Sequence, residues 1–335
     1  MAAHRMTASP ARPTVAYLLA PSHSGSTLLA LLLASHPQVA TVGELNLSAV
    51  DDRQRYLCSC GTRLKDCDFW RQIASRMAAR NVEFDVLHPG TDFRHVNSGY
   101  VARLLRPLHR GRWLEAGRDS ALALSSAWRA TYRRVQTRNA ALVQAVADET
   151  GARVIVDSSK IGIRLKFLLR NPDIDVRVVR VVRDGRAVAL TYTDPARYAD
   201  ASNPALRGGG TGGTREHEKL RMDAAAREWL RSHEEADALL AGLDPSRWMQ
   251  VRYEAVCTET EDTLAQVFRF LGVDPAAPRV PFRQAGHHVV GNGMRLDTSS
   301  DIAVDERWRS LLTAVDQQVF DAVAGQRNRR FGYST

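Results

Sequence analysis

One segment near the start of the chain dictates how the fold begins: Tyr17–Ala34 is an apolar run, a short polar loop and a second apolar run. The first run is typical of a buried strand and the second has helical spacing, so the loop opens a helix. Backbone N–H groups and the positive end of the helix dipole attract anions there. Gly25 lets a ligand approach the backbone closely. The sequence therefore predicts a phosphate-binding loop formed by Ser22, His23, Ser24, Gly25, Ser26 and Thr27.

The loop lacks the parts that mark an ATP- or GTP-hydrolysing P-loop. A Walker A loop needs Gly-x-x-x-x-Gly-Lys-Ser/Thr, in which the lysine contacts the terminal phosphates and the hydroxyl contacts Mg²⁺. Here the loop has one glycine, Gly25, and no lysine follows it. An alternative without a ligand stays open at this point, because Ser and Thr are also favoured helix N-caps.

The composition is that of an ordinary folded protein with a basic surface. The chain has 335 residues, 44% of them hydrophobic and 25% charged, and a formal net charge of +9. This length suits one elaborated domain or two small ones. A basic surface favours anionic partners, including a membrane surface, although a general preference for arginine explains the same charge. Aromatic and basic residues do not alternate as in nucleic-acid-binding segments, so no nucleic-acid partner is predicted.

No segment has the form of a secretory signal or a membrane span. The apolar runs Val15–Ala20 and Leu28–Ala34 are too short for either role. We therefore expect a cytoplasmic protein without structural disulfides, and a basic, disordered leader at residues 1–13.

Alternating strand and helix patterns predict an α/β fold with a central parallel sheet flanked by helices. The further apolar runs Val154–Val156, Val176–Val182 and Trp248–Val251 are each followed by a helical pattern, as in β-α units. The later helices are expected at about 217–240, 253–271 and 305–324.

Two segments interrupt this alternation. Residues 50–150 have mostly helical patterns and are predicted to form a helical cap inserted into the sheet domain. Residues 194–215 contain the glycine-rich run 208–213 and are predicted to be a flexible loop, either a lid or plain disorder.

A second anion site is predicted after the strand 176–182. Arg183 follows the strand, and parallel α/β sheets bind ligands in the crevice at the carboxyl ends of their strands. Thr191 lies about two helical turns further on, so its hydroxyl can share a phosphate with Arg183. Taken singly, the pattern also fits a surface Arg-Asp pair.

Together the two sites resemble the nucleotide signatures of sulfotransferases that use 3′-phosphoadenosine 5′-phosphosulfate (PAPS). In that family the first loop holds the 5′-phosphosulfate, and the arginine with a Ser/Thr eight residues later holds the 3′-phosphate. The resemblance implies a P-loop-like sulfotransferase fold as a single domain over 14–335, with the helical cap its least matched part. It continues through Val156–Lys160, Val251–Val256, Phe270–Gly272, His288–Arg295 and Phe331–Tyr333.

Two positions depart from the family pattern. The first loop usually carries Lys or Arg where this chain has His23, and Ser is usual where it has Thr191. Thr keeps the hydroxyl, whereas an imidazole is largely neutral at pH 7. A neighbouring phosphosulfate would favour the protonated ring of His23 and raise its pKa.

The resemblance also implies roles for several further residues. Lys160 matches family lysines that contact the bridging or leaving oxygen, with a solvated lysine as the alternative. Glu44 looks like the Gly-Glu segment whose carboxylate is the general base in the tyrosyl-protein branch, with a surface or N-cap glutamate as the alternative. Asp157 is expected to cap or to orient Lys160. Arg295 is expected to reach the 3′-phosphate from a late loop. Cations and N–H donors then stabilise the transferring group without a metal ion.

Three of the four cysteines lie close together in the sequence, at Cys58, Cys60 and Cys67. The spacing lacks the paired Cys-x-x-Cys form and a fourth ligand of a usual zinc site. A reduced, packed cluster is expected, while oxidation or metal binding by the Cys-x-Cys pair stays open.

The predicted function is therefore the transfer of a sulfuryl group from PAPS to a hydroxyl, or less favourably an amine, of a glycan, glycolipid or small-molecule acceptor. Two alternatives remain at this level. One is a P-loop-type kinase, against which the absent Walker lysine argues. The other is a module that binds PAPS or the product 3′-phosphoadenosine 5′-phosphate (PAP) without catalysis, for which His23 would be the sign.

Overall fold

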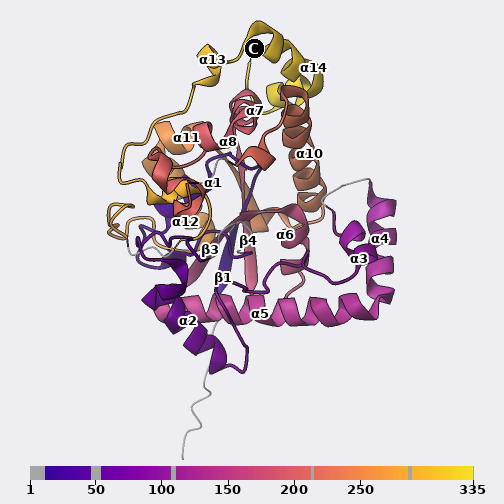
Figure 1. Cartoon of the computed structure of the whole chain (residues 1–335), viewed down its shortest axis with the longest axis vertical. Coiled ribbons are helices and arrows are strands. Elements are labelled where there is room, and N and C mark those ends of the chain that lie inside the picture. Colours follow the sequence, from indigo (N-terminus) through magenta and orange to yellow (C-terminus); the bar gives the residue numbers. More distant parts are fainter. Residues whose placement is uncertain (1–11, 47–53, 107–110, 213–214, 286–288, 335) are drawn as a thin grey trace, which may run out of the picture.

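A computed structural model describes residues 12–46, 54–106, 111–212, 215–285 and 289–334. The described residues form a parallel five-stranded sheet with the strand order β2-β3-β1-β4-β5 (Figure 1). The strands are β1 (Thr14–Leu19), β2 (Val39–Thr41), β3 (Val154–Lys160), β4 (Asp175–Val182) and β5 (Trp248–Arg252). The predicted α/β class and the predicted strands are confirmed.

Helices follow the strands and cover both faces of the sheet. In chain order they are α1 (Ser26–Leu33), α2 (Asp68–Ala78), α3 (Gly99–Leu104), α4 (Arg112–Leu124), α5 (Ser126–Thr150), α6 (Gly162–Leu168), α7 (Gly185–Thr193), α8 (Pro195–Tyr198), α9 (Arg207–Gly210), α10 (Met222–Leu240), α11 (Tyr253–Thr258), α12 (Thr260–Leu271), α13 (Trp308–Leu311) and α14 (Ala314–Arg330).

Side-chain alternation along β1 divides the core into two layers. Successive strand residues point to opposite faces, so Val15 and Tyr17 join one buried cluster while Ala16 and Leu18 join another. Both faces of β1 are therefore buried, as its continuous apolar sequence predicts for a central parallel strand.

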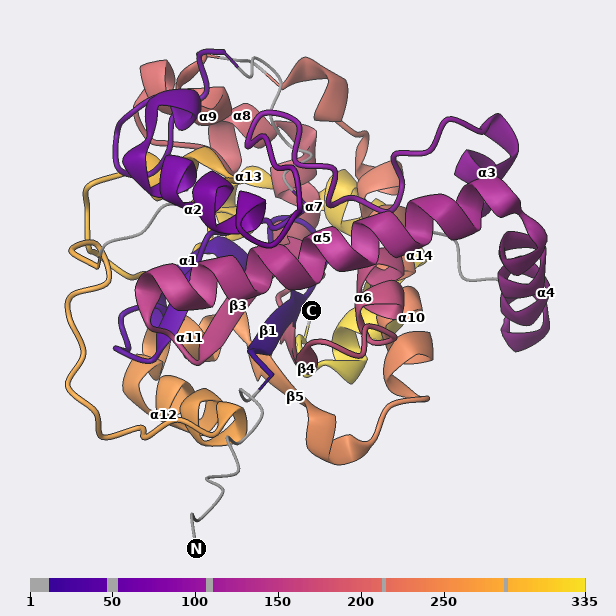
Figure 2. The ribbon, with the colours of Figure 1, turned by 90° about the horizontal axis from the view of Figure 1, so that it is seen from below.

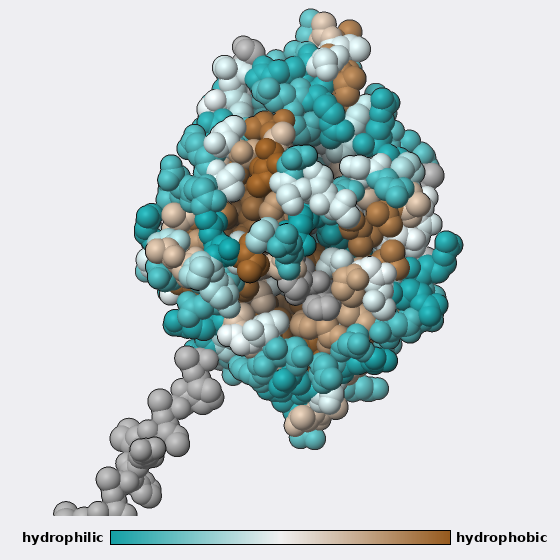
Figure 3. Space-filling model, turned by 90° about the vertical axis from the view of Figure 1, so that its left-hand side faces the viewer, coloured by the Kyte–Doolittle hydropathy of each residue, from teal (hydrophilic) through white to brown (hydrophobic). Residues whose placement is uncertain are grey.

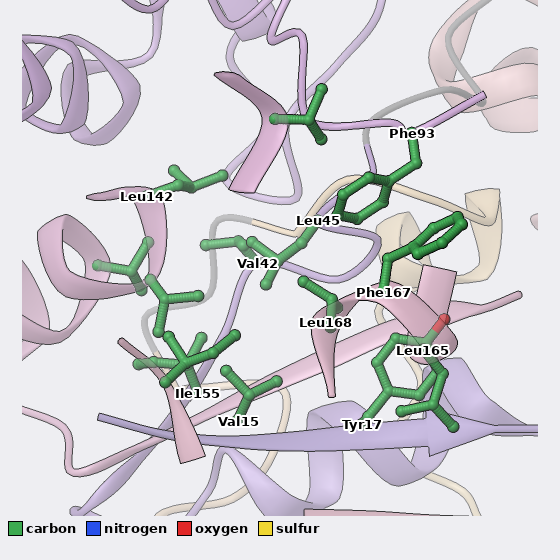
Figure 4. Close-up of a cluster of buried hydrophobic side chains, with 14 of the residues drawn as sticks. Val15, Tyr17, Val42, Leu45, Phe93, Leu142, Ile155, Leu165, Phe167 and Leu168 are labelled. Atoms are coloured by element: carbon green, nitrogen blue, oxygen red, sulfur yellow. The ribbon is translucent and has the colours of Figure 1, made fainter. Parts of the chain in front are cut away.

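The first face is covered by helices from the segment that was predicted to be a cap. The long helix α5 runs across the strands in the view from below (Figure 2). Its Leu142 belongs to the same buried cluster as Ile155 of β3 and Val15 of β1 (Figure 4). Phe167 of α6 and Phe93 complete this cluster. The described part of 50–150 is helical as predicted, but α5 serves as a layer of the sheet domain.

The second face is covered by α1, α11 and α12. Every residue of α1 except Thr27 is buried, because this apolar helix lies between the sheet and α12. A third cluster joins α7, α10, α13 and α14. Trp229 of α10 is fully buried in it, as expected for a core residue.

Some boundaries differ from the prediction for local reasons. The predicted helix 253–271 is two helices, because Glu259 between them has non-helical dihedral angles of −128° and 44°. The predicted helix 305–324 is likewise divided at Thr313, which caps α14 through a capping box with Asp316. Pro13, at the end of the predicted leader, is buried and its carbonyl accepts a hydrogen bond from Asp175. The rest of that leader, residues 1–11, lies outside the described residues.

Among the described residues, no helix is both long enough and apolar enough to span a bilayer. Figure 3 shows one face of the molecule as mainly hydrophilic, with apolar side chains gathered in small separate patches.

Candidate functional site

The carboxyl ends of the strands meet around one large cavity. Its volume is about 790 Å³, within the range of about 300–1,000 Å³ typical of small-molecule sites. Each strand sends residues to its wall. These are Ser22, His23, Gly25, Ser26 and Thr27 of the loop after β1, Glu44 after β2, Lys160 at the end of β3, Arg183 after β4 and Tyr253 after β5. Ser24 of the same loop is fully buried and does not line the cavity.

The loop after β1 has an unusual backbone conformation at two positions. His23 and Gly25 have positive φ angles of 64° and 83°, and Gly25 is the N-cap of α1. No acidic residue lies in the first turn of α1, so its unsatisfied N–H groups and dipole remain available to an anion.

The ring of Tyr253 explains why the loop needs glycine. A Cβ atom on Gly25 would lie 2.3 Å from Cδ2 of Tyr253, far inside van der Waals contact. The same ring lies under the guanidinium of Arg183, whose Cζ is 4.4 Å from the ring centroid. Gly25 and Arg183 are therefore packed against one aromatic side chain.

Buried polar atoms without partners gather at this loop. Within the described residues, His23 Nδ1, Ser24 Oγ and Arg183 Nε are buried and make no hydrogen bond. Buried polar groups are normally satisfied, so three such atoms on neighbouring residues indicate a place for a polar ligand. The donors here suit an anion.

Arg183 also fixes the loop. Its Nη1 donates to the carbonyl of His23 at 2.7 Å, and its Nη2 pairs with Asp305 Oδ2 at 2.8 Å. Burial opposes ionisation of Asp305, but hydrogen bonds from Arg307 and the charge of Arg183 hold the pKa of Asp305 down at about 2. A phosphate that binds Arg183 must therefore compete with the carboxylate of Asp305 for the guanidinium.

Lys160 and Glu44 form an ion pair on the cavity wall, with Lys160 Nζ 2.5 Å from Glu44 Oε1. Both side chains are mostly buried. Lys160 has a φ of 67°, an uncommon conformation for a non-glycine residue that often marks a functional position. The carbonyl of Ile161 beside it accepts a 2.7 Å hydrogen bond from the Tyr17 hydroxyl, which fixes the turn.

Asp157 holds the segments of this pair together. Its Oδ1 accepts hydrogen bonds from the backbone N–H groups of Ser159 at 2.9 Å and Leu45 at 3.3 Å. Its Oδ2 accepts from Arg164 Nε at 3.0 Å, and both partners are almost fully buried. Asp157 therefore fixes the residues next to Glu44 and Lys160, whereas it was expected to cap or to orient Lys160 itself.

The surroundings of His23 disfavour its charged form. Burial, followed by the positive charges of Arg215, Lys160 and Arg183, lowers the pKa of His23 well below its usual value. Its ring packs edge-on against Tyr192, with centroids 4.7 Å apart. The sequence argument for a raised pKa applies only once an anion occupies the loop.

The structure does not bring Thr191 and Arg295 to the cavity wall. Thr191 is buried in α7, and its hydroxyl donates to the carbonyl of Ala187 at 2.9 Å. Arg295 is buried, and its guanidinium donates to backbone carbonyls of Val289, Gly291, Asn292 and Leu57. It therefore braces the turn after Val289, whereas a 3′-phosphate contact was expected. His288, the first residue of the predicted late motif, lies outside the described residues.

The cavity wall includes residues that the sequence argument did not assign to the site. Tyr253 lies in a segment quoted for the family resemblance, and its spacing after a strand could have identified it. Tyr56 and Asp305 carry no local signal. Part of the predicted 194–215 loop also lines the cavity, through Asp200, Gly208, Gly209 and Arg215 among others.

Comparisons with known proteins identify the chain's relatives. Residues 18–277 match the family model described as the sulfotransferase family. A curated relative, carbohydrate sulfotransferase 3 of Homo sapiens, is 30% identical over 182 residues, which are 50% of this chain and 36% of the human protein. The chain thus spans about a third of that relative's length.

Among solved structures, the sulfotransferase domain from the Synechococcus PCC 7002 olefin synthase has a TM-score of 0.50 at 17% identity. The similarity covers 97% of this chain and 96% of that domain. The sulfotransferase domain from the curacin biosynthetic pathway has a TM-score of 0.48 at 16% identity, covering 96% and 98%. The first of these comparisons agrees with the α/β fold described above.

Proposed function

Because this chain belongs to the sulfotransferase family, we propose that it transfers a sulfuryl group from PAPS to a hydroxyl group of an acceptor held in the cavity. The observation that carries this proposal is the meeting of the anion-binding loop, Arg183 and the Lys160–Glu44 pair in one cavity. The loop suits the phosphosulfate and the pair suits the transfer step.

In this proposal the donor is held by the loop and Arg183. The 5′-phosphosulfate takes the N–H groups at the start of α1 and the unsatisfied atoms of His23 and Ser24. The 3′-phosphate takes the guanidinium of Arg183, in competition with Asp305. Ser22, Ser26 and Thr27 supply further hydroxyls around the same anion.

The transfer step needs one base and one group that stabilises the leaving oxygen. The acceptor oxygen forms a bond to sulfur, and the bond from sulfur to the bridging oxygen of the donor breaks, which leaves PAP. Glu44 takes the acceptor's proton. Lys160 stabilises the negative charge that develops on the bridging oxygen. Their ion pair keeps both groups beside the reacting atoms.

The proposed acceptor is a glycan, a glycolipid or a small molecule, with an amine in place of the hydroxyl as the less favoured case. The name of the human relative supports a carbohydrate. The cavity wall supports a polar acceptor, because the carboxylates of Glu228 and Glu235 lie along it.

The direct test is sulfuryl transfer from radiolabelled PAPS to a panel of sugars, glycolipids, phenols and amines. We expect labelled product together with an equal amount of PAP. Tight PAP binding with no labelled product across the whole panel would favour the non-catalytic module.

Arg183→Met should remove the discrimination for the 3′-phosphate. Losing hydrogen bonds to a charged group costs about 1.5–3 kcal/mol, so PAP affinity should fall by about 10–100-fold. AMP affinity should fall less, because AMP loses only the support that Arg183 gives to the loop. Arg177→Met is the matched control, because Arg177 lies on β4, the strand that precedes Arg183, and contacts Phe270 outside the cavity. Calorimetric titration of each variant with both nucleotides measures this. Equal losses for PAP and AMP would contradict the assignment.

Gly25→Ala should weaken PAP binding by at least about tenfold, since a displaced Tyr253 ring moves Arg183. Gly151→Ala is the control, because Gly151 has a similar φ of 70° but open space around its Cβ position. Both variants should lose about 1–2 kcal/mol of stability from backbone strain. Equal PAP affinity of Gly25→Ala and Gly151→Ala in calorimetry would show that the packing of Gly25 and Arg183 against Tyr253 does not affect PAP binding.

Donor binding should draw a proton onto His23. Burial and neighbouring positive charges lower the pKa of His23, and a bound anion beside the ring raises it. The complex with the donor therefore carries more protons than the free protein. As a result, the affinity for the donor falls as the pH rises. Calorimetry at pH 6–7 in buffers of different ionisation enthalpy should show greater proton uptake, by up to about one proton, in the wild type than in His23→Asn. Asn suits the positive φ of this position. Identical uptake in both proteins would show that His23 stays neutral.

A further inference from the structure

Three cysteines form a compact cluster away from the reacting groups. Cys58 and Cys60 lie in a tight hairpin that is closed by a bridge between Leu57 and Arg63, and Cys67 is the N-cap residue of α2. The N–H of Cys58 donates to the carbonyl of Thr62 at 2.8 Å. The turn and the helix start therefore bring three sulfur atoms to one point.

The distances between these sulfur atoms match a metal site. The Sγ atom of Cys67 lies 3.7 Å from that of Cys60 and 3.8 Å from that of Cys58, and all three lie within 4.8 Å of one another. A Zn–S bond of about 2.3 Å gives a tetrahedron whose edges are about 3.8 Å. A disulfide requires sulfur atoms about 2.05 Å apart. The arrangement fits a shared ion better than a covalent bridge.

Burial raises the pKa of the Cys58 and Cys67 thiols, and backbone N–H groups oppose this effect by donating to the sulfur atoms. The N–H of Cys60 bonds to the Cys58 sulfur, the N–H of Thr62 to the Cys60 sulfur, and the N–H of Trp70 to the Cys67 sulfur. Donors aimed at ligand atoms orient them and tune the metal in metalloproteins. Each cysteine of the cluster has such a donor.

We propose that Cys58, Cys60 and Cys67 bind one Zn²⁺ ion as thiolates. Binding displaces the three thiol protons to solvent. Within the described residues no fourth His, Cys, Asp or Glu atom joins the cluster, so the fourth position is left to a water molecule beside the exposed Cys60. Soft thiolate ligands in tetrahedral geometry select zinc over Mg²⁺ or Ca²⁺.

The ion would fix a segment that supports the cavity wall. Leu57 donates its N–H to Gly209 at 2.8 Å, and the Ser59 hydroxyl accepts the N–H of Val289 at 2.8 Å. The adjacent Tyr56 lines the cavity, and its hydroxyl donates to Gly291 at 2.6 Å. The zinc would have a structural role, because it would tie this hairpin to the start of α2, while hydrogen bonds hold the hairpin against the other wall segments.

The test measures the metal content of the full chain by inductively coupled plasma mass spectrometry. The protein is purified under reducing conditions and without chelators. We expect about one zinc per chain in the wild type. The same content is expected in the control Cys257→Ser, which keeps the cluster, and a large loss is expected in Cys60→Ser. Since Cys60 is exposed, this variant should fold, which circular dichroism checks.

Cobalt substitution gives a second measurement. The wild type loaded with Co²⁺ should show thiolate-to-cobalt charge-transfer absorption and the intense visible bands of tetrahedral coordination, and Cys60→Ser should lose part of both.

A chain that holds no zinc after reconstitution, a Cys60–Cys67 disulfide found by peptide mapping of alkylated protein, or a Cys60→Ser variant that keeps zinc with unchanged affinity would each overturn the proposal. These measurements do not depend on sulfuryl transfer, so their failure is distinct from failure of the proposed function.

Discussion

Lys160→Met is expected to lower kcat for sulfuryl transfer by about 10²–10³-fold, the usual cost of removing one group that stabilises developing negative charge. The affinity for PAP should change little, because the loop and Arg183 hold the phosphates in this account. The physical reason is the position of Lys160 Nζ on the cavity wall, held in place by Glu44 and by an unusual backbone conformation.

Lys166→Met is the matched control for this variant. Lys166 pairs with Glu115 at 3.0 Å and with Asp119, and it does not line the main cavity. It should cost some stability and leave kcat near the wild-type value. Steady-state rates together with PAP titrations measure the effect. A Lys160→Met enzyme that transfers normally but binds PAP weakly would assign this lysine to binding.

Glu44→Gln is expected to lower kcat by about 10²–10⁴-fold, the range for loss of a general base. The amide keeps the shape of the carboxylate and can still contact Lys160, but it cannot take a proton. If Glu44 only positions Lys160, Glu44→Gln should therefore lower kcat far less than it would if Glu44 is the base. Pre-steady-state measurement of PAP formation separates the chemical step from product release.

The control for Glu44→Gln is Glu115→Gln, which breaks a Lys-Glu pair outside the main cavity. The double variant Lys160→Met/Glu44→Gln should be much less impaired than the product of the two single effects, because the groups act as a unit. Strictly multiplicative effects, or a Glu44→Gln enzyme with near-normal kcat, would refute the role of Glu44 as the base.

The sequence was enough to predict the parallel sheet and the loop that opens α1. Val-rich strands buried on both faces produce continuous apolar runs, and a Ser/Gly loop before an apolar helix marks where an anion can bind. The sequence singles out Glu44 and Lys160 separately but does not predict their ion pair, because it joins the segment after β2 to the end of β3, which are far apart in the chain.

What the sequence could not predict depends on packing between distant elements. Thr191 fits a phosphate contact by spacing alone, yet its hydroxyl is used by its own helix. Arg295 follows two glycines in an open-looking turn, yet backbone carbonyls take its donors. Tyr253 contacts both Gly25 and Arg183 only because β5 lies beside β4.

The central claim is that the loop at α1 and Arg183 form a site for a nucleotide with a 3′-phosphate. It is tested most directly by calorimetric titration of the wild-type protein with PAP, AMP and ATP under one set of conditions. The account predicts that PAP binds at least about tenfold more tightly than AMP, a difference of about 1.4 kcal/mol, and more tightly than ATP. Equal affinity for PAP and AMP, or a preference for ATP, would contradict it.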